Sequence, residues 1–507
     1  MMVADNKTTA IMLGKLLEQW VAVPANMDCG ISGVTQDSRT VKPGDLFLAC
    51  LGQTVNGVEY IDEAIEKGAR AIIWQHDEGA KPIAMSVRRS KQGDNIPVIA
   101  IPDLANKAGL IAAQFYNHPS QHLFVTGFTG TNGKTSCSHF LAQALNEDET
   151  TGVIGTLGNG LYGELETATH TTPDAVTCQK WLAEMFSAGA KNIAMEVSSH
   201  ALDQGRVTGV EFDCAVFTNL TRDHLDYHGD MESYLESKQK LFLCPTLKYA
   251  VINIDDASGP AIKAVTPGNV KVITYGLSNE NDLADVYAKE IHLGRDGIKL
   301  HINTPWGKGE LHSHLMGRFN ISNLLAVLSV LLLKGMNLKT ALARLAKVQG
   351  VAGRMQCIAM QDRPLVVIDY AHTPDALEHV LTAIHEHTKG NTWCVFGCGG
   401  DRDQGKRSQM GRVADKLADQ VVITTDNPRS EDPQAIAEDI LEGMTKSSRI
   451  HVELDRAQAI DYAISHAKEN DIILVAGKGH EDYQEVNGKR YPFNDYSMVQ
   501  HYLQVNV

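Results

Sequence analysis

The stretch with the clearest chemical potential is residues 127–136, which read GFTGTNGKTS. The apolar run 123–126 before it predicts a buried strand, and residues 140–145 after it predict a helix. Backbone N–H groups in such a turn, together with the start of the helix, attract phosphate oxygens. Lys134 would then reach the β- and γ-phosphates, and the hydroxyl of Thr135 would bind Mg²⁺. We therefore predict a loop that binds ATP.

The spacing of the glycines departs from the usual phosphate-binding pattern. That pattern requires glycine at position 128, where Phe128 stands, and the glycines here are Gly127 and Gly130. The alternative is an ordinary glycine turn with a surface lysine. The order of strand, turn and helix favours the phosphate-binding loop.

Composition limits the possible partners. The chain has 507 residues and a formal net charge of −15, which argues against general binding to nucleic acid or to an anionic membrane. No apolar run approaches the ~18 residues of a membrane span, and the first residues do not resemble a signal peptide. The cysteines are scattered without paired spacing, so we expect reduced thiols and a cytoplasmic protein.

Alternating apolar and amphipathic segments predict an α/β protein with three domains. Residues 1–120 predict a small α/β domain in which the polar stretch 76–94 is a loop. Residues 121–350 predict a mostly parallel sheet with β-hairpins near 286–316, and residues 351–507 predict a second, Rossmann-like α/β domain. In the first domain, Ser38 and the turn 52–57 either bind a ligand or form an ordinary turn.

In the central segment, polar residues follow the predicted strands 192–197 and 214–218. Ligands of open parallel sheets gather at this edge. Glu196 is well placed to complete a Mg²⁺ shell with Thr135, because Mg²⁺ prefers carboxylate and phosphate oxygens. His224 either contributes to a second cation site or caps a helix, and spacing alone does not decide between these roles.

The C-terminal segment has charged loops after its predicted strands 365–369, 392–396, 421–425 and 472–475. Arginine binds a carboxylate through two parallel hydrogen bonds, and a carboxylate can receive an ammonium group. The loops supply both kinds of group and so predict an amino-acid pocket, with a set of surface ion pairs as the alternative. The residues concerned are Arg402, Lys406, Arg407, Asp426, Arg429 and Glu481.

An ATP loop combined with an amino-acid pocket indicates carboxylate activation. ATP would phosphorylate a carboxylate to an acyl phosphate, which an amine then attacks. Positioning and charge neutralisation supply most of the catalysis in phosphoryl transfer. Because the reacting groups lie in different predicted domains, we expect domain closure.

Several motifs resemble those of the Mur ligases over nearly the whole chain. They are Asp37-Ser-Arg39, Gly130-Thr-Asn-Gly-Lys-Thr135, Met195-Glu-Val-Ser-Ser-His200, Thr218-Asn-Leu-Thr-Arg-Asp-His-Leu-Asp226, Gly353-Arg-Met355, Val367-Ile-Asp-Tyr-Ala-His-Thr-Pro-Asp375, Asp426-Asn-Pro-Arg429 and Gly477-Lys-Gly-His-Glu481. The displaced glycine is the form that this family uses. The resemblance implies three domains that bind a UDP-sugar peptide, ATP and an incoming amino acid in turn.

The resemblance also assigns roles to individual residues. The nucleotide would contact Gly130, Thr131, Asn132, Gly133, Lys134, Thr135, Ser136, Asn323, Arg354 and Asp369. The UDP-MurNAc-dipeptide would contact Gln36, Ser38, Gln53, Thr54, Val55, Thr171, Thr172, Ser198, Gln204 and Arg206. Catalysis would involve Lys134, Glu196, His224 and Lys238. The metal ligands would be Thr135, Glu196, His224 and Lys238, the last as a carbamylated lysine.

In this family the Asp-Asn-Pro-Arg motif implies that the amino acid added is meso-2,6-diaminopimelate. It would join the D-glutamate of UDP-MurNAc-L-Ala-D-Glu in peptidoglycan precursor synthesis, and we expect a monomer. The pocket would comprise Arg402, Asp426, Asn427, Pro428, Arg429, Gly477 and Glu481. His170 stands where many relatives carry asparagine. The alternatives are a ligase that adds L-lysine, an enzyme similar to folylpolyglutamate synthetase, and a non-catalytic nucleotide-binding regulator.

Overall fold

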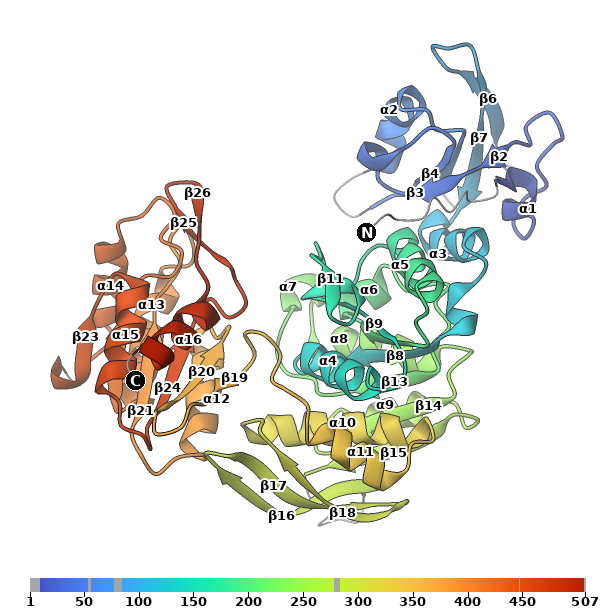
Figure 1. Cartoon of the computed structure of the whole chain (residues 1–507). Helices are drawn as coiled ribbons and strands as arrows, with labels where there is room; N and C mark the ends of the chain where they lie inside the picture. Colours follow the sequence, from blue (N-terminus) through green and yellow to red (C-terminus); the bar gives the residue numbers. More distant parts are fainter. Residues whose placement is uncertain (1–9, 53–55, 77–83, 278–282, 446, 506–507) are drawn as a thin grey trace. The chain divides into compact units, whose positions relative to one another are not determined.

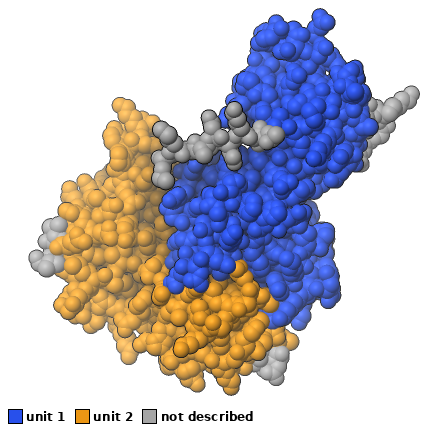
Figure 2. All heavy atoms as spheres, turned by 45° about the vertical axis from the view of Figure 1, so that its right-hand side comes forward, with its two compact units in different colours: residues 1–273 blue, residues 274–507 orange. Residues whose placement is uncertain are grey.

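Strands and helices alternate along most of the chain in the computed structural model, which confirms the α/β class (Figure 1). The structure describes residues 10–52, 56–76, 84–277, 283–445 and 447–505. The chain divides into two compact units, residues 1–273 and 274–507 (Figure 2). None of the helices in the described ranges is both long enough and apolar enough to span a membrane.

The N-terminal part of the first unit is a small sheet with the strand order β3-β4-β5-β7-β6. All its pairings are parallel except that between β6 and β7. The strands are β3 (Gly33–Thr35), β4 (Asp45–Ala49), β5 (Ala71–His76), β6 (Met85–Arg89) and β7 (Asn95–Pro102), and a separate pair is formed by β1 (Ile11–Met12) and β2 (Gly30–Ile31). The helices are α1 (Leu13–Leu17), α2 (Ile61–Glu66) and α3 (Leu104–Phe115).

The prediction that residues 76–94 form a loop is wrong, because β6 lies within them. Its side chains are mostly exposed, and it lies at the edge of the sheet. An edge strand needs no apolar face, because backbone hydrogen bonds to one neighbour hold it and charged side chains protect its open side. Because the sequence of β6 is polar, its pattern did not predict a strand.

The central part of the first unit is a larger, mostly parallel sheet in the order β11-β10-β9-β12-β8-β13-β14-β15. Its strands are β8 (Phe124–Thr129), β9 (Thr151–Gly155), β10 (Gly158–Leu161), β11 (Glu164–Glu166), β12 (Asn192–Glu196), β13 (Cys214–Phe217), β14 (Tyr249–Asn253) and β15 (Lys271–Gly276). Its helices are α4 (Lys134–Leu145), α5 (Ala175–Ser187), α6 (Ser199–Asp203), α7 (Leu225–His228), α8 (Met231–Gln239) and α9 (Gly259–Val265). In this order β8 lies between β12 and β13, so the phosphate-binding loop emerges beside Glu196.

The boundary between the units falls within β15, whose last residues, Tyr275 and Gly276, pair with β16 (Val286–Gly294). Strands β17 (Gly297–Thr304) and β18 (Gly307–Ser313) complete the predicted hairpins. Two helices pack on these strands, α10 (Arg318–Leu333) and α11 (Leu338–Leu345) (Figure 1). Helix α10 is apolar on nearly all sides, and most of its side chains are buried, as expected of a core helix.

The rest of the second unit is a sheet in the order β19-β20-β24-β21-β22-β23. Its strands are β19 (Gln356–Ile358), β20 (Leu365–Asp369), β21 (Thr392–Phe396), β22 (Gln420–Ile423), β23 (Ile450–Val452) and β24 (Ile472–Ala476), and all pairings but that of β19 are parallel. A hairpin of β25 (Tyr483–Val486) and β26 (Lys489–Pro492) follows. The helices are α12 (Pro374–His385), α13 (Gly405–Leu417), α14 (Pro433–Leu441), α15 (Arg456–His466) and α16 (Asp495–Val505).

Alternate residues of β20 face opposite sides of this sheet, as the two-residue period of a strand requires. Leu365 and Val367 join a core with α12, α13 and α14. Val366 and Ile368 join another core with α15 and α16. A strand buried on both faces reads as a continuous apolar run, which is why the sequence predicts these strands well.

Candidate active site

The segment from Gly130 to Ser136 forms a tight turn between β8 and α4. Gly130 and Gly133 have φ angles of 154° and 87°, which residues other than glycine rarely adopt. A Cβ atom at Gly130 would lie 1.9 Å from Thr218 Oγ1. Lys134 begins α4 and folds back over the turn, donating from Nζ to the carbonyl oxygens of Gly130 (2.7 Å) and Thr131 (2.9 Å). The turn thus combines a lysine and the N-terminus of a 12-residue helix, a setting suited to phosphate oxygens.

Glu196 ends β12 and is fully buried. Its carboxylate accepts hydrogen bonds from Thr135 Oγ1 (2.8 Å), Thr156 N (2.8 Å) and Thr156 Oγ1 (3.2 Å). Burial raises the pKa of Glu196, and the charge of Lys134 is the largest effect opposing that rise. The two predicted oxygen ligands, Thr135 and Glu196, are therefore in direct contact. Hard oxygen donors of this kind suit Mg²⁺.

His224 lies in the loop after β13 with φ 53°, and its side chain is half exposed. Its Nε2 is 3.4 Å from Asp223 Oδ2, and its ring contacts the ring of His200 at 4.9 Å between centroids. Among the residues that the structure describes, no group of at least three His, Cys, Asp or Glu side chains is arranged to hold a metal ion. The role of His224 as a metal ligand therefore stays a prediction.

Lys238 is buried in α8, with only 1 % of its surface exposed. Its Nζ lies over the ring of Tyr234, 4.3 Å from the centroid, and the hydroxyl of Tyr234 is 3.1 Å from Thr131 Oγ1. Burial lowers the pKa of Lys238 to about 6; the nearby charge of Lys134 lowers it further, and Asp223 opposes the shift. The structure thus distinguishes Lys238 from an ordinary surface lysine, because it is buried, has a lowered pKa and packs on a tyrosine that contacts the phosphate-binding loop.

The residues predicted to hold the sugar peptide form one hydrogen-bonded network beside Glu196. Thr172 Oγ1 donates to the carbonyl oxygen of Glu196 (2.8 Å) and accepts from Ser198 N (3.1 Å). Arg206 donates to Gln204 Oε1 (2.9 and 2.6 Å) and to the carbonyl oxygen of Thr172 (3.1 Å). Thr171 also joins this network, through Thr156, whose hydroxyl lies 3.0 Å from Thr171 Oγ1. His170 is exposed and contacts Thr169.

Two of the predicted UDP contacts lie in the N-terminal part of the first unit, at the ends of short strands. Ser38 is buried, and its hydroxyl donates to Glu63 Oε2 (2.9 Å). Gln36 donates from Nε2 to Cys50 Sγ (3.1 Å), whereas its buried Oε1 has no partner among the described residues. The other predicted contacts, Gln53, Thr54 and Val55, lie outside the described residues.

In the second unit, Asp369 ends β20 and organises the segment that carries Arg354. Its carboxylate accepts from the N–H groups of Met355 and Ala371, at 2.8 Å each. Burial raises the pKa of Asp369, and the hydrogen bond from Met355 is the largest effect opposing the rise. The guanidinium group of Arg354 lies 5.4 Å from the centroid of the Tyr370 ring. Asn323, on α10, is buried and donates to Asn320 Oδ1 (3.0 Å).

The predicted amino-acid residues gather after β22 and β24. Asn427 Nδ2 donates to Glu481 Oε2 (2.9 Å), and Lys478 Nζ donates both to Glu481 Oε2 (2.9 Å) and to Asn427 Oδ1 (3.1 Å). Asp426 lies beside this group, and a Cβ atom at Gly477 would be 2.5 Å from its Oδ2. Burial raises the pKa of Asp426. Lys478 is fully buried and forms an ion pair with Glu481. The sequence did not predict this residue as part of the pocket, because its only signal was a position three residues before Glu481.

Arg402 and Arg429 converge on Gly399. A Cβ atom at Gly399 would lie 3.0 Å from Arg429 Nη1 and 3.8 Å from Arg402 Cγ. Arg429, after Pro428, has φ 52° and donates from Nη1 to the carbonyl oxygen of Gly400 (2.7 Å). Its Nε is 3.6 Å from Glu485 Oε2. The guanidinium group of Arg429 and the aliphatic stem of Arg402 therefore both approach Gly399.

One member of the predicted cationic group is not available for a ligand. Arg407 is buried and paired with Glu431 Oε1 and Asp439 Oδ2, at 2.8 Å each. Its sequence context does not distinguish it from Arg402, because both precede or begin the same helix. Its burial on the inner face of α13 makes it a structural residue.

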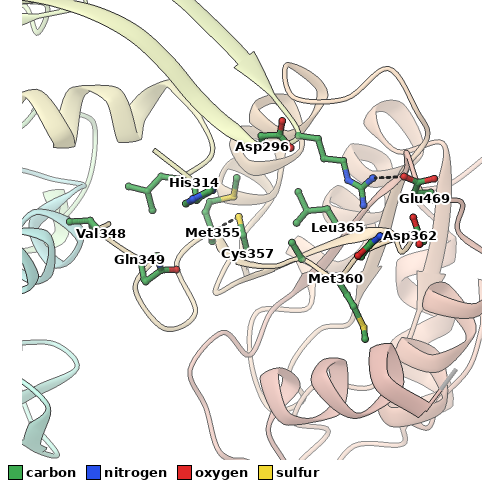
Figure 3. A pocket seen from close by; sticks show the side chains of 15 residues that line it. Asp296, His314, Val348, Gln349, Met355, Cys357, Met360, Asp362, Leu365 and Glu469 are labelled. Atoms are coloured by element: carbon green, nitrogen blue, oxygen red, sulfur yellow. Dashed lines mark hydrogen bonds and ion pairs between the residues drawn. The ribbon is translucent and has the colours of Figure 1, made fainter. Parts of the chain in front are cut away.

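A cavity of about 620 Å³ in the second unit is not the predicted amino-acid pocket (Figure 3). It is lined by the segment 348–350, by Met355 and Cys357, and by the hairpin residue Asp296. It contains none of the residues predicted to bind substrates. Met355 connects it to the nucleotide segment through its hydrogen bond to Asp369.

The lowered pKa of Lys238 predicts a characteristic dependence of stability on pH. The unfolded chain keeps the Lys238 proton up to its ordinary pKa of 10.5, whereas the folded chain loses it above about 6. Native stability therefore gains about 1.4 kcal/mol per pH unit from this residue between those values. Lys238→Met should raise Tm most near pH 6 and progressively less towards pH 9, in CO₂-free buffer. Lys263→Met, at an exposed lysine of α9, is the control; a Tm difference independent of pH would contradict a neutral Lys238.

Comparison with known proteins identifies the family. Sequence profiles match residues 30–116 ("Mur ligase family, catalytic domain"), 128–331 ("Mur ligase middle domain") and 353–479 ("Mur ligase, glutamate ligase domain"). A protein of Chromobacterium violaceum is 50 % identical over 477 residues, 93 % of this chain and 94 % of its own length. One of Pseudomonas aeruginosa is 48 % identical over 480 residues, 94 % and 96 % of the two chains. Both are named UDP-N-acetylmuramoyl-L-alanyl-D-glutamate–2,6-diaminopimelate ligase.

Solved structures agree with these relatives. A structure of a protein with that same name has a TM-score of 0.75 at 34 % identity and covers 98 % of this chain and 99 % of its own. A MurF structure from Acinetobacter baumannii has a TM-score of 0.61 at 19 % identity, which shows the shared fold alone. On the matched profiles and the close relatives, the chain belongs to the Mur ligase family, whose members are ATP-dependent amide ligases.

Proposed function

We propose that the chain adds meso-2,6-diaminopimelate to the D-glutamate of UDP-MurNAc-L-Ala-D-Glu, with ATP converted to ADP and phosphate, in peptidoglycan precursor synthesis. The observation that carries the proposal is the side-chain cluster of the second unit, where Arg402 and Arg429 approach Gly399 and where Asp426 and Glu481 provide carboxylates. Relatives that are 50 % and 48 % identical carry the name of this reaction.

We expect the reaction to proceed in two steps. A carboxylate oxygen of D-glutamate attacks the γ-phosphorus of ATP, and the bond to the bridging oxygen breaks to release ADP. The amine of diaminopimelate then attacks the acyl carbon, loses a proton and expels phosphate. Lys134 and the N-terminus of α4 would hold the phosphates during the first step, and Arg206 with its neighbours would orient the acceptor. Most of the rate acceleration would come from this positioning.

Mg²⁺ fits the oxygen donors beside the phosphate-binding loop. Thr135 and Glu196 would hold the ion, with substrate phosphates and water completing its shell and His224 serving a second ion. When bound, it would neutralise charge on the transferring phosphoryl group. Of these donors, Glu196 is fully buried.

The environment of Lys238 supports carbamylation. A neutral amine attacks CO₂, forming an N–C bond and releasing a proton, and a pKa of about 6 leaves Lys238 neutral at pH 7. The resulting carbamate would be an anion close to Thr131 and Lys134, where it could act as a further oxygen ligand.

Removal of the Lys238 amine should therefore abolish activity, and an added carboxylate should restore part of it. We expect Lys238→Ala to lose nearly all activity and to recover part of it in acetate, which would supply the missing anion. Lys263→Ala, at an exposed lysine, should keep wild-type activity with and without acetate. Full activity of Lys238→Ala without any additive would exclude the metal-bridging role.

The three-domain division is part of the proposal. The profile matches, 30–116, 128–331 and 353–479, fall inside the ranges 1–120, 121–350 and 351–507. In order, these would bind the UDP-sugar peptide, ATP and the amino acid. All cysteines are free thiols, which supports the cytoplasm as the site of action. That the protein acts as a monomer stays a prediction.

The pocket favours diaminopimelate over L-lysine. The far end of diaminopimelate carries a carboxylate and an amine, whereas lysine has only the amine. Without a carboxylate partner, the partly buried Arg429 would lose charge-assisted hydrogen bonds, a cost of about 1–3 kcal/mol. A folylpolyglutamate synthetase activity has no use for this pair of arginines.

The decisive experiment measures ADP release by the purified protein. We expect release only when UDP-MurNAc-L-Ala-D-Glu and diaminopimelate are both present, with kcat/KM for L-lysine at least tenfold lower. Equal use of lysine would assign the chain to the lysine-adding branch. Release with a folate and glutamate would indicate folylpolyglutamate synthesis, and ATP binding without turnover would indicate a regulator.

In the same assay, Arg429→Ala should raise KM for diaminopimelate at least tenfold, about 1.4 kcal/mol of binding. KM for ATP should change less than about twofold, because Arg429 would contact only the amino acid. Arg412→Ala, at an exposed arginine of α13, is the matched control. An unchanged KM for diaminopimelate in Arg429→Ala would remove Arg429 from the pocket.

A further inference from the structure

A buried ion pair lies beneath the proposed amino-acid pocket. Arg456 is the first residue of α15, Asp495 is the first residue of α16, and both side chains are 0 % exposed. The contact is bidentate, with Nε to Oδ1 at 2.7 Å and Nη2 to Oδ2 at 2.8 Å. Planar pairing of this kind fixes the orientation of the guanidinium group.

The same guanidinium group also binds two backbone carbonyl oxygens. Arg456 Nη1 donates to Thr425 O (3.2 Å), and Nη2 donates to Ala476 O (3.0 Å). Thr425 immediately precedes Asp426, and Ala476 immediately precedes Gly477. Both carbonyl groups therefore belong to residues whose next neighbour is part of the proposed pocket.

These two chain segments have no direct pairing with each other. In the sheet order β20-β24-β21-β22, strand β21 separates β24 from β22. Arg456 therefore joins the ends of two strands across the end of a third. The fit is close, because a Cβ atom at Gly477 would approach Asp426 Oδ2 to 2.5 Å.

Fold stability alone does not account well for this pair. An arginine in the first turn of a helix opposes the helix dipole. Buried ion pairs can often be replaced by apolar residues without loss of stability. The charge of Arg456, however, acts on a residue of the proposed pocket. Burial raises the pKa of Asp426, and the positive charge of Arg456 opposes this rise more than that of Lys478 does. Glu481 and Asp495 act in the opposite direction.

We propose that Arg456, held by Asp495, is a positioning residue for the amino-acid substrate. It sets the spacing between Asp426 and Gly477, so that the side chain of Asp426 is placed to receive an ammonium group of the substrate. Arg456 itself touches no substrate. The inference rests on the proposed function, since it concerns the pocket for diaminopimelate.

The test is a comparison of Michaelis constants in the full-length protein. The double variant Arg456→Met with Asp495→Leu removes both charges together and so leaves neither buried without a partner. We expect KM for diaminopimelate to rise at least tenfold, while KM for ATP and for UDP-MurNAc-L-Ala-D-Glu changes less than twofold. Arg456→Lys keeps a charge but cannot reach both carbonyl groups and both carboxylate oxygens, so its KM for diaminopimelate should lie in between.

Asp471→Asn is the matched control. Asp471 is buried just before β24, at the opposite end of that strand, where it accepts hydrogen bonds from Asn391 N, Trp393 Nε1 and Lys468 N. The Asp471→Asn substitution should lower Tm without a selective change in KM for diaminopimelate. A rise of all three KM values in the double variant, no rise at all, or the same selective rise in Asp471→Asn would overturn the proposal.

Two further outcomes keep the result interpretable. If the double variant does not fold, Asp495→Asn is measured against the same criterion, with a threefold selective rise as the threshold. If the wild-type protein does not use diaminopimelate at all, the proposed function fails. If the wild type uses it and the variants show no selective effect, only the role of Arg456 fails.

Discussion

The contact between Thr135 and the buried carboxylate of Glu196 is the interaction on which the first unit depends. Through its side chain, Glu196 holds the phosphate-binding loop and the loop after β9, where Thr156 donates two hydrogen bonds. Through its carbonyl group it accepts from Thr172 and so connects to Ser198 and Arg206. A buried carboxylate is costly unless its oxygens are hydrogen-bonded. Because the oxygens of Glu196 must be hydrogen-bonded, the residues proposed to bind ATP and those proposed to bind the sugar peptide meet at the end of one strand.

In the second unit, the order of the parallel strands brings together loops that are far apart in the sequence. Because β24, late in the sequence, inserts between β20 and β21, the loop at Gly477 lies between loops that precede it by about 80 to 110 residues of chain. Asn427, Lys478 and Glu481 then close a hydrogen-bonded group between loops that the sequence separates. The arrangement follows the rule that ligands bind at the carboxyl ends of parallel strands.

Sequence patterns predicted the strands that are buried on both faces, and with them the loops at their ends, because a short continuous apolar run between polar turns is typical of such a strand. They missed β6, whose polar edge position requires no apolar pattern. They also could not separate Arg407 from Arg402, since the burial of Arg407 depends on its tertiary ion pairs with Glu431 and Asp439. Lys238 was placed only by resemblance; its lowered pKa arises from tertiary burial and from Lys134, about 100 residues away in the chain.

The choice of hydrogen-bond acceptor separates structural cations from those proposed to bind substrates. Arg407 and Arg456 are each paired with carboxylates of the fold at 2.7–2.8 Å. Arg206 donates to an amide oxygen and a carbonyl oxygen, and the shortest contact of Arg429 is to a carbonyl oxygen, with a carboxylate only at 3.6 Å. Neutral acceptors orient a guanidinium group but leave most of its charge to act on a ligand. A protein with a net charge of −15 can thereby present local positive sites to anionic substrates.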